Sequence, residues 1–317
     1  MIDEETREAV VTYAQNHGVD EAALLFEGIV SKSTIYRWMA DHLMYGYTLE
    51  ECHKEYSNYK KLAPRYMARI GTNRLVHTFQ PHFFHKERTL WKNPKIRKKL
   101  LENRRHYLKK QDITPREILR GFKISGIHIG YSHFSPLWLV KFVEDYGCKS
   151  IYDPCGGWGH RLIGAGICGC DYIYNDKWSL SVEGAKAMAK ELGITAKFYN
   201  NCCMSFQPEE DYDSVFTCPP YYNTEVYEEE FVSISEYWLF LYKMIQNAVK
   251  PSVNYLGIVI NRTYEKHVIQ NVLSAVDNFT LFDIHKLGTT EHISHLNDAE
   301  KAEKEEVLLV FKRTSLE

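Results

Sequence analysis

The sequence predicts an α/β protein: a Rossmann-like sheet with helices on both faces, preceded by an all-α N-terminal domain. Short apolar runs at 150–153, 171–175 and 213–216 alternate with segments of helical length, which is the pattern of parallel strands joined by crossover helices. The first run passes through a glycine-rich turn into a helix. The first 43 residues instead show helix caps and amphipathic spacing.

The N-terminal domain, residues 1–45, is expected to contain three helices. Residues that favour helix starts and turns separate the helical patterns. The expected helices are Glu4–His17, Glu21–Phe26 after a cap at Asp20, and Lys32–Leu43 after a turn at Gly28 and a cap at Ser31.

Residues 46–118 form a basic and mostly helical segment. Between residues 51 and 120 the chain has 19 Lys and Arg against 6 Asp and Glu, whereas the segments on either side are acidic. A helix is expected over Pro94–Lys110. Phosphate contacts from such a segment would dominate affinity for DNA and make it salt-dependent; we expect them from Lys98, Arg104 and Arg105. The alternative is a solvated helix whose charge only keeps the protein in solution.

The sheet domain, residues 119–317, is expected to continue with regular elements after its first strand. These are strands at Asp171–Asn175, in the 198–206 region, at Asp213–Phe216 and at Asn254–Asn261, helices at Ser179–Leu192, Ser235–Val249 and Tyr264–Val276, and an antiparallel pair at Phe279–Leu287 and Glu306–Arg313. The acidic and aromatic stretch Asn223–Phe231 is expected to form a loop over the site.

A glycine-rich turn follows the first strand, in the run Asp153-Pro-Cys-Gly-Gly-Trp-Gly159. Glycines allow a backbone to approach a ligand closely, and the following helix start offers free N–H groups. The spacing is neither the dinucleotide fingerprint nor a P-loop. Asp176 lies about 20 residues beyond the turn, where a carboxylate can bind ribose hydroxyls. It is also placed to cap the helix that follows.

The segment Thr217-Cys-Pro-Pro-Tyr-Tyr222 directly follows a strand. Because two prolines cannot continue a strand, the chain must leave the sheet stiffly. Ligands of open α/β sheets bind at this carboxyl edge. The alternative is a loop that only ends the strand and packs two tyrosines.

Together, Asp153–Gly159 and Cys218–Tyr221 resemble the motifs of the S-adenosylmethionine-dependent DNA amino-methyltransferases, typically Asp-Pro-Phe-x-Gly-x-Gly and Asp/Asn/Ser-Pro-Pro-Tyr/Phe. The segment Gly130–Trp138 is similar to the one that precedes the glycine motif in many of them, and Ser132–Ala165 is similar to methyltransferases of bacteriophage and bacterial origin. The resemblance covers roughly residues 115–313. It implies a class I methyltransferase sheet with S-adenosylmethionine as cofactor.

The resemblance also implies a role for each motif residue. In this family the target base is flipped out of the duplex, and the enzyme aligns its amino group with the methyl carbon, largely a proximity effect. Tyr221 would stack on the base, the Pro219 carbonyl would accept a hydrogen bond from the amino group, Cys218 would occupy the polar position, and Pro220 completes the motif. The residues expected around the cofactor are Phe134, Ser135, Asp153, Cys155, Gly156, Gly157, Gly159, Asp176 and Cys202.

Cys218 departs from the family pattern. A thiol is a weak hydrogen-bond partner and is not an acid at neutral pH. Serine at this position tends to accompany cytosine methylation and aspartate adenine methylation, so Cys218 does not identify the base. One alternative makes Cys218 a covalent nucleophile for carbon-5 methylation, although such enzymes place Cys after Pro. Another lets Thr217 supply the hydroxyl that Cys218 lacks.

Near the N-terminus, the run Val30–Trp38 resembles the recognition helix of transposase- and resolvase-like helix-turn-helix domains. In such domains the first side chains of the helix meet base edges. Here these would be Lys32, Ser33, Thr34 and Arg37. Because the segment is acidic, the alternative is a small helical docking or dimerisation module, the latter making a homodimer.

Other classes of protein are not indicated. The chain has no run of about 18 apolar residues and no signal peptide, which predicts a soluble protein of the cytoplasm without membrane contact. Its eight cysteines include no C-x-x-C pair, so neither a zinc site nor a disulfide framework is expected. His77, His82 and His85 lack the further ligands of a metal site.

The sequence therefore predicts a methyltransferase that moves a methyl group from S-adenosylmethionine to an exocyclic amine of double-stranded DNA, on N6 of adenine or N4 of cytosine. The alternatives are a methyltransferase acting on RNA or a nucleotide, and a DNA-binding regulator whose methyltransferase fold is inactive.

Overall fold

The computed structural model describes residues 2–17, 19–32, 34–35, 38–39, 47–62, 74–80, 85–108, 115–125, 134–222, 231–288 and 305–314. The chain divides into two compact units, one of residues 1–57 with 72–131 and the other of residues 58–71 with 132–317. The three-part division at residues 45 and 118 stays a prediction.

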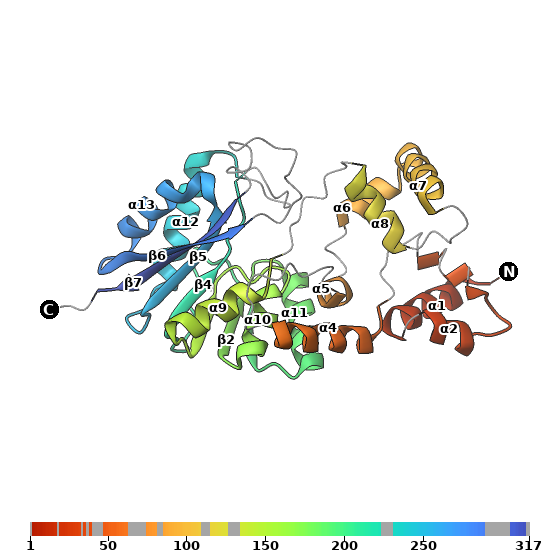
Figure 1. Cartoon of the computed structure of the whole chain (residues 1–317), viewed down its shortest axis with the longest axis horizontal. Coiled ribbons are helices and arrows are strands. Elements are labelled where there is room, and N and C mark those ends of the chain that lie inside the picture. Colours follow the sequence, from red (N-terminus) through yellow and green to blue (C-terminus); the bar gives the residue numbers. More distant parts are fainter. Residues whose placement is uncertain are drawn as a thin grey trace. The chain divides into compact units, whose positions relative to one another are not determined.

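The second unit contains a seven-stranded sheet with the order β3-β2-β1-β4-β5-β7-β6 (Figure 1). The strands are β1 (Ser150–Asp153), β2 (Asp171–Asn175), β3 (Ala196–Tyr199), β4 (Ser214–Thr217), β5 (Tyr255–Asn261), β6 (Phe279–Gly288) and β7 (Glu306–Arg313). The first five are parallel, and β7 lies antiparallel between β5 and β6. The predicted Rossmann-like α/β fold is confirmed by the order and direction of these strands.

Helices cover both faces of this sheet, as predicted. They are α9 (Leu137–Tyr146), α10 (His160–Cys168), α11 (Ser179–Leu192), α12 (Ile234–Ala248) and α13 (Glu265–Ala275). Side chains of α12 and α13 form one buried cluster with the sheet, and side chains of α9, α10 and α11 form another. The predicted helix positions agree with the observed bounds to within a few residues.

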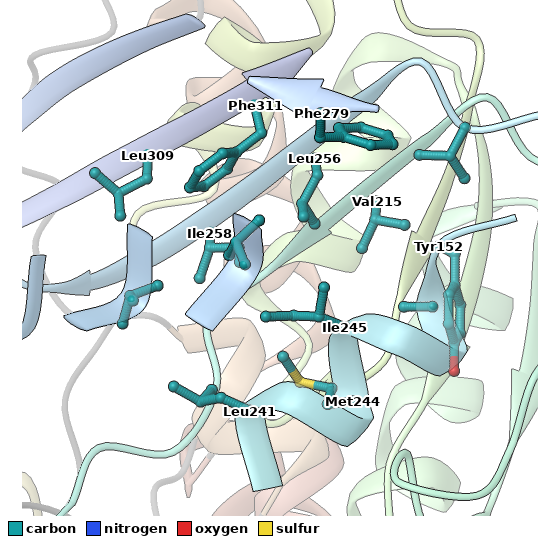
Figure 2. Close-up of a cluster of buried hydrophobic side chains, with 14 of the residues drawn as sticks. Tyr152, Val215, Leu241, Met244, Ile245, Leu256, Ile258, Phe279, Leu309 and Phe311 are labelled. Carbon is teal, nitrogen blue, oxygen red and sulfur yellow. The ribbon is translucent and has the colours of Figure 1, made fainter. Parts of the chain in front are cut away.

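Strand alternation supplies both clusters. On β7, Leu309 and Phe311 face α12, as Figure 2 shows, whereas Leu308 and Val310 belong to the cluster on the opposite face. A strand that is covered on both sides has to be apolar at nearly every position. Each fully buried Leu or Phe contributes about 1.5–3 kcal/mol to folding. Packing on both faces of the sheet therefore holds the strands, and their ends, in a fixed register.

The first unit is helical. Its helices are α1 (Glu4–His17), α2 (Val19–Leu25), α4 (Leu49–Leu62, which continues into the other unit), α5 (Arg74–Phe79), α6 (His85–Trp91), α7 (Pro94–Leu108) and α8 (Pro115–Ile124). Thr48 and Glu51 form a capping box at the start of α4, because each side chain accepts the other's backbone N–H.

The N-terminal helices share a small core. Val10 and Ala14 of α1 pack with Ala22 of α2 and with Ile35 and Met39, which follow the turn at residue 28. The predicted cap is present, because the Ser31 hydroxyl accepts the backbone N–H of Thr34 at 3.3 Å. The turn at Gly28 has a φ of 80°.

Within the described ranges, no helix is long and apolar enough to cross a membrane.

Candidate functional site

The two sequence motifs leave the sheet at the same edge. β1 lies between β2 and β4, and all three strands are parallel. The glycine turn follows β1, Asp176 follows β2, and Cys218 follows β4. In open parallel sheets, loops at this carboxyl edge hold ligands. The structure therefore brings the predicted cofactor and catalytic segments to neighbouring strand ends.

A fully buried carboxylate, Asp153, joins these strand ends. Its Oδ1 accepts the Thr217 hydroxyl at 3.0 Å and the backbone N–H of Cys155 at 3.2 Å. Its Oδ2 accepts the Tyr172 hydroxyl and Nε of Arg161, both at 2.5 Å. The side chain is 0% exposed. Both oxygens of Asp153 are therefore occupied by protein groups, and its predicted place among the cofactor residues stays a prediction.

Arg161, on the first turn of α10, neutralises Asp153 and braces the glycine turn. Its guanidinium also donates to the Cys155 carbonyl and lies 5.3 Å from the Phe134 ring centroid. Burial alone would lower the pKa of Arg161. The Asp153 carboxylate outweighs this effect and raises the pKa, with smaller contributions from Tyr172 and Cys218. Arg161 thus stays charged inside the site and links the glycine turn to the residues that follow β4.

The glycine turn is tied to Asp176. The Gly157 N–H donates to Asp176 Oδ2 at 2.8 Å, and the Trp178 N–H donates to Oδ1 at 2.9 Å. Burial raises the pKa of Asp176, and these two hydrogen bonds partly offset the effect. The cap of α11 is Trp178 rather than Asp176, so the predicted capping role is wrong. Asp176 instead fixes the turn with its carboxylate.

Glycine is favoured at the three predicted positions of the turn for different structural reasons. Gly157 and Gly159 have φ values of 56° and 83°, which favour glycine. A Cβ on Gly157 would meet no atom closer than 3.8 Å, whereas a Cβ on Gly156 would lie 2.2 Å from the Tyr174 ring. Gly156 is therefore required by a packed tyrosine, whereas a Cβ on Gly157 would make only ordinary van der Waals contacts.

The residue after Tyr174 connects two loops. Asn175 is fully buried, and its amide donates to the carbonyls of Pro154 and Asn201, both at 3.1 Å. Its Oδ1 accepts the Asn201 N–H at 3.1 Å. This side chain thus fixes the glycine turn against the loop after β3, which contains Cys202.

Phe134 and Ser135 lie directly before α9. The Phe134 ring contacts Arg161 and packs edge-on against Phe216 of β4 at a centroid distance of 6.3 Å. The Ser135 Oγ is buried without a hydrogen-bond partner among the described residues. The neighbouring Ser132 and His133 lie outside the described residues. Both predicted side chains are thus half-buried, with the ring of Phe134 against the glycine-turn arginine.

The two predicted cofactor cysteines have different surroundings, and their contact with a cofactor stays a prediction. Cys155 Sγ lies 3.8 Å from Cys203 Sγ and 3.6 Å from Met244 Sδ. The Cys203 thiol, together with burial, raises the pKa of Cys155 well above its usual value. Cys202 is half-buried, and its carbonyl accepts the N–H groups of Ser205 and Phe206. The side chain of Cys155 therefore packs in the core, and only its backbone belongs to the turn.

The segment predicted to be catalytic leaves the sheet after β4, as predicted. The strand ends at Thr217, and the Thr217 hydroxyl, fully buried, donates to Asp153. The idea that Thr217 replaces a hydroxyl missing from Cys218 is therefore wrong. Cys218 and Pro220 are half-buried, and Pro219 is buried.

Tyr221 is only 7% exposed, and its hydroxyl donates to Glu306 of β7 at 3.0 Å. Stacking of a base on Tyr221 thus requires that the groups covering the ring move aside. Tyr222 beside it is half-buried and contacts Tyr237 of α12. Of the predicted loop Asn223–Phe231, residues 223–230 lie outside the described residues.

In the N-terminal unit, Lys32 is exposed and pairs with Asp20, a contact worth about 0–1 kcal/mol at a surface. The hydroxyl of Thr34 lies 3.0 Å from that of Ser31. Ser33 and Arg37 lie outside the described residues. The helix-turn-helix assignment therefore stays a prediction.

Helix α7 presents a basic face. Lys98 and Arg105 are exposed, as are Lys95, Arg97 and Lys99. Arg104 is different: its side chain is 4% exposed and its guanidinium pairs with Glu117 of α8. The predicted DNA contact of Arg104 is wrong, because a side chain buried in this ion pair cannot reach a phosphate at the surface.

The sequence alone did not indicate Arg161, Asn175 or Glu306 as site residues. Their partners lie on other strands, at sequence separations of up to 85 residues for Tyr221 and Glu306. Arg161 carried a detectable signal, since an arginine on a buried helix start needs a carboxylate partner. Among the described residues, no group of three or more His, Cys, Asp or Glu side chains is arranged to hold a metal ion.

No protein-family model matches the sequence, and no curated protein matches it. Several solved structures are similar in fold. A proposed class I S-adenosylmethionine-dependent methyltransferase from Listeria monocytogenes is 14% identical with a TM-score of 0.42, covering 84% of this chain and 89% of that chain.

The N-methyltransferase NodS from Bradyrhizobium japonicum, in complex with S-adenosyl-L-homocysteine, is 10% identical with a TM-score of 0.41, covering 57% of this chain and 86% of that chain. TrmN from Thermus thermophilus is 12% identical with a TM-score of 0.41, covering 64% of this chain and 55% of that chain. The fold assignment rests on the order and direction of the strands.

Proposed function

We propose that this protein is an S-adenosylmethionine-dependent methyltransferase that methylates an exocyclic amine of double-stranded DNA. One observation carries the proposal: the glycine turn and the Cys218–Tyr222 segment leave adjacent parallel strands at the same edge. The Thr217–Asp153 hydrogen bond ties their origins together. A methyl donor at the turn and an amine at the Pro-Pro-Tyr segment would then meet at one place.

The residues at the turn fit the cofactor. Helix α10 begins at His160 after the N-cap Gly159, which has no side chain to cap it, so the first amides of the helix could bind a carboxylate. Gly157 and the Ser135 Oγ, which has no hydrogen-bond partner among the described residues, lie on segments that the resemblance assigns to the cofactor. The Asp176 carboxylate is the group that would hold ribose hydroxyls.

When bound, S-adenosylmethionine supplies a methyl group on a sulfonium, whose leaving thioether is neutral. The protein must hold the amine in line and exclude water. The carbonyl of Pro219 would accept one amino hydrogen, and the rigid Pro219-Pro220 backbone would hold that acceptor in place. The network of Asp153 and Arg161 would keep both loops fixed while substrate binds.

The DNA substrate is supported by the resemblance of Cys218–Tyr221 and by the exposed basic face of α7. Lys98 and Arg105 would contact phosphates and give strong salt dependence. The ring of Tyr221 would stack on the flipped base once its cover moves. Lys32 and Thr34 would reach base edges if residues 31–39 act as a recognition helix.

Transfer of a tritiated methyl group to duplex DNA, RNA and free nucleotides tests this proposal. We expect label in duplex DNA. Label only in RNA or nucleotides would favour the alternative substrates. Cofactor binding without transfer to any of the three would favour a regulator with an inactive fold.

A further inference from the structure

Arg161 is a buried cation beside the glycine turn, and one of its nitrogens is unoccupied. A guanidinium has five N–H donors. Nε donates to Asp153 and Nη2 donates to the Cys155 carbonyl, whereas Nη1 has no hydrogen-bond partner among the described residues. Because Nη1 is not among the polar atoms that are both buried and unpartnered, solvent reaches it, although the side chain is only 6% exposed. The buried charge therefore keeps two donors for a group that none of the described residues supplies.

The neighbours of Arg161 hold its guanidinium in place. The Asp153 carboxylate lies 2.5 Å from Nε, and the Phe134 ring lies against the guanidinium with its centroid at 5.3 Å. The Cys155 carbonyl fixes Nη2. These contacts exist before a ligand binds, which reduces the entropy that binding would cost. A fixed, planar guanidinium is suited to a planar carboxylate.

The guanidinium lies next to the backbone of the glycine turn. A Cβ on Gly157 would lie 4.0 Å from Nη2 of Arg161. Arg161 itself lies on the first turn of α10, which opens with the hydrogen bond from the Ile163 N–H to the carbonyl of the N-cap Gly159. The amides before Ile163 have no carbonyl within the helix, and the helix dipole adds positive potential there. The turn, the helix start and the guanidinium thus favour an anion at one place.

Opposite charges lie at the two ends of the turn. At one end, the Asp176 carboxylate accepts the Gly157 N–H at 2.8 Å. At the other end, the Arg161 guanidinium donates to the Cys155 carbonyl. A ligand that carries hydroxyl donors at one end and a carboxylate at the other fits this arrangement in one direction, because a carboxylate beside Asp176 would be repelled.

We propose that Arg161 binds the carboxylate in the methionine part of S-adenosylmethionine and thereby sets the direction in which the donor crosses the glycine turn. The identity of the ligand rests on the proposed function. Asp176 follows β2, whereas Asp153, the partner of Arg161, is hydrogen-bonded to Thr217 of β4. The methionine end would therefore lie towards β4, where Cys218–Tyr222 begins.

The test compares two ligands that differ in one group. S-adenosylhomocysteine carries the carboxylate, and its decarboxylated form keeps the adenosine, the sulfur and the amine. Calorimetric titration of the full chain measures both affinities without any turnover. We expect the natural protein to bind S-adenosylhomocysteine about 10- to 100-fold more tightly than the decarboxylated form, the range of a hydrogen bond to a charged group.

Arg161→Met keeps the length of the side chain and removes its donors. The ratio of the two affinities should fall by about tenfold, because only the carboxylate ligand loses a partner. Tyr172→Phe is the matched control: it removes a hydrogen bond to the same Asp153 oxygen and keeps Arg161, so its ratio should equal that of the natural protein. Should Arg161→Met fail to fold with Asp153 unpaired, the Asp153→Asn/Arg161→Met variant decides, since it removes both buried charges.

An unchanged ratio in Arg161→Met would overturn the inference, because an arginine that only braces the turn affects both ligands alike. If S-adenosylhomocysteine still binds tightly in that case, the proposed function stands without this contact. A ratio that falls in a protein transferring no methyl group to nucleic acid would support the inference and reject the proposed reaction. A folded natural protein that binds neither ligand would reject both.

Discussion

The last residue of β4 is hydrogen-bonded to the last residue of β1: the Thr217 hydroxyl donates to the Asp153 carboxylate at 3.0 Å, and both side chains are fully buried. The two segments that carry the sequence motifs therefore begin from one shared contact. A change at this contact should disturb both.

Thr217→Val keeps the shape of the side chain and removes the donor. Because hydrogen bonds to charged groups contribute about 1.5–3 kcal/mol, we expect the free energy of unfolding to fall by about that amount. Denaturant unfolding of the full chain checks this, with Thr217→Ser as a control that keeps the hydroxyl. A Val variant as stable as the natural protein would show that the bond contributes nothing.

Gly156→Ala should be strongly destabilising, because its Cβ would lie 2.2 Å from a ring that is fully buried. Overpacking of this kind costs about 1–3 kcal/mol or more. Replacing the ring in a Gly156→Ala/Tyr174→Leu double variant should recover part of the loss, measured by a double-mutant cycle.

The matched control for this cycle is Gly157→Ala, where the penalty comes from backbone conformation, about 1–2 kcal/mol. Tyr174→Leu should not relieve it. Additive effects of Gly156→Ala and Tyr174→Leu would contradict the packing explanation for Gly156.

Neighbouring basic residues of α7 should differ in their effects on DNA binding and on stability. Lys98→Ala and Arg105→Ala should each lower the salt slope of DNA binding by about 1 while changing stability by no more than about 0.5 kcal/mol. Arg104→Ala removes the buried partner of Glu117, which keeps a longer contact of 3.9 Å with Arg120, and should cost up to about 3–5 kcal/mol of stability.

Fluorescence anisotropy with a DNA duplex at several salt concentrations, together with denaturant unfolding, distinguishes these effects. A flat salt dependence in the natural protein would count against the basic face as a DNA contact. An Arg104→Ala protein of unchanged stability would contradict the buried pair.

Glu210 provides a pH-dependent contribution beside β3. Burial alone would raise its pKa, but the Tyr199 hydroxyl at 2.6 Å and Lys197 at 2.9 Å lower the pKa to about 2 from 4.5. Because the folded pKa lies below the unfolded one, the stabilisation is complete above about pH 4.5 and is lost as pH falls towards 2. The difference in free energy of unfolding between the natural protein and Glu210→Gln should shrink over this pH range. Curves of unfolding free energy against pH that run parallel for the two proteins would refute this contribution of Glu210.

Local chemistry made much of the site predictable. Prolines that cannot pair in a sheet ended β4 at the predicted place, and glycines marked the turn after β1. The reasons behind single residues were not predictable, because they depend on partners from other strands. Gly156 is required by Tyr174, and Arg104 is buried by Glu117 on another helix. Tyr221 donates a hydrogen bond to Glu306, which lies on β7, 85 residues later in the chain.

The most direct test of the central claim is the identity of the methylated nucleoside. Duplex DNA is incubated with the purified protein and S-adenosylmethionine, digested to nucleosides and analysed by mass spectrometry, with Tyr221→Ala in parallel. We predict N6-methyladenine or N4-methylcytosine from the natural protein, and neither from Tyr221→Ala, which should still bind the cofactor. Methylation at carbon 5 of cytosine, or undiminished transfer by Tyr221→Ala, would contradict the account.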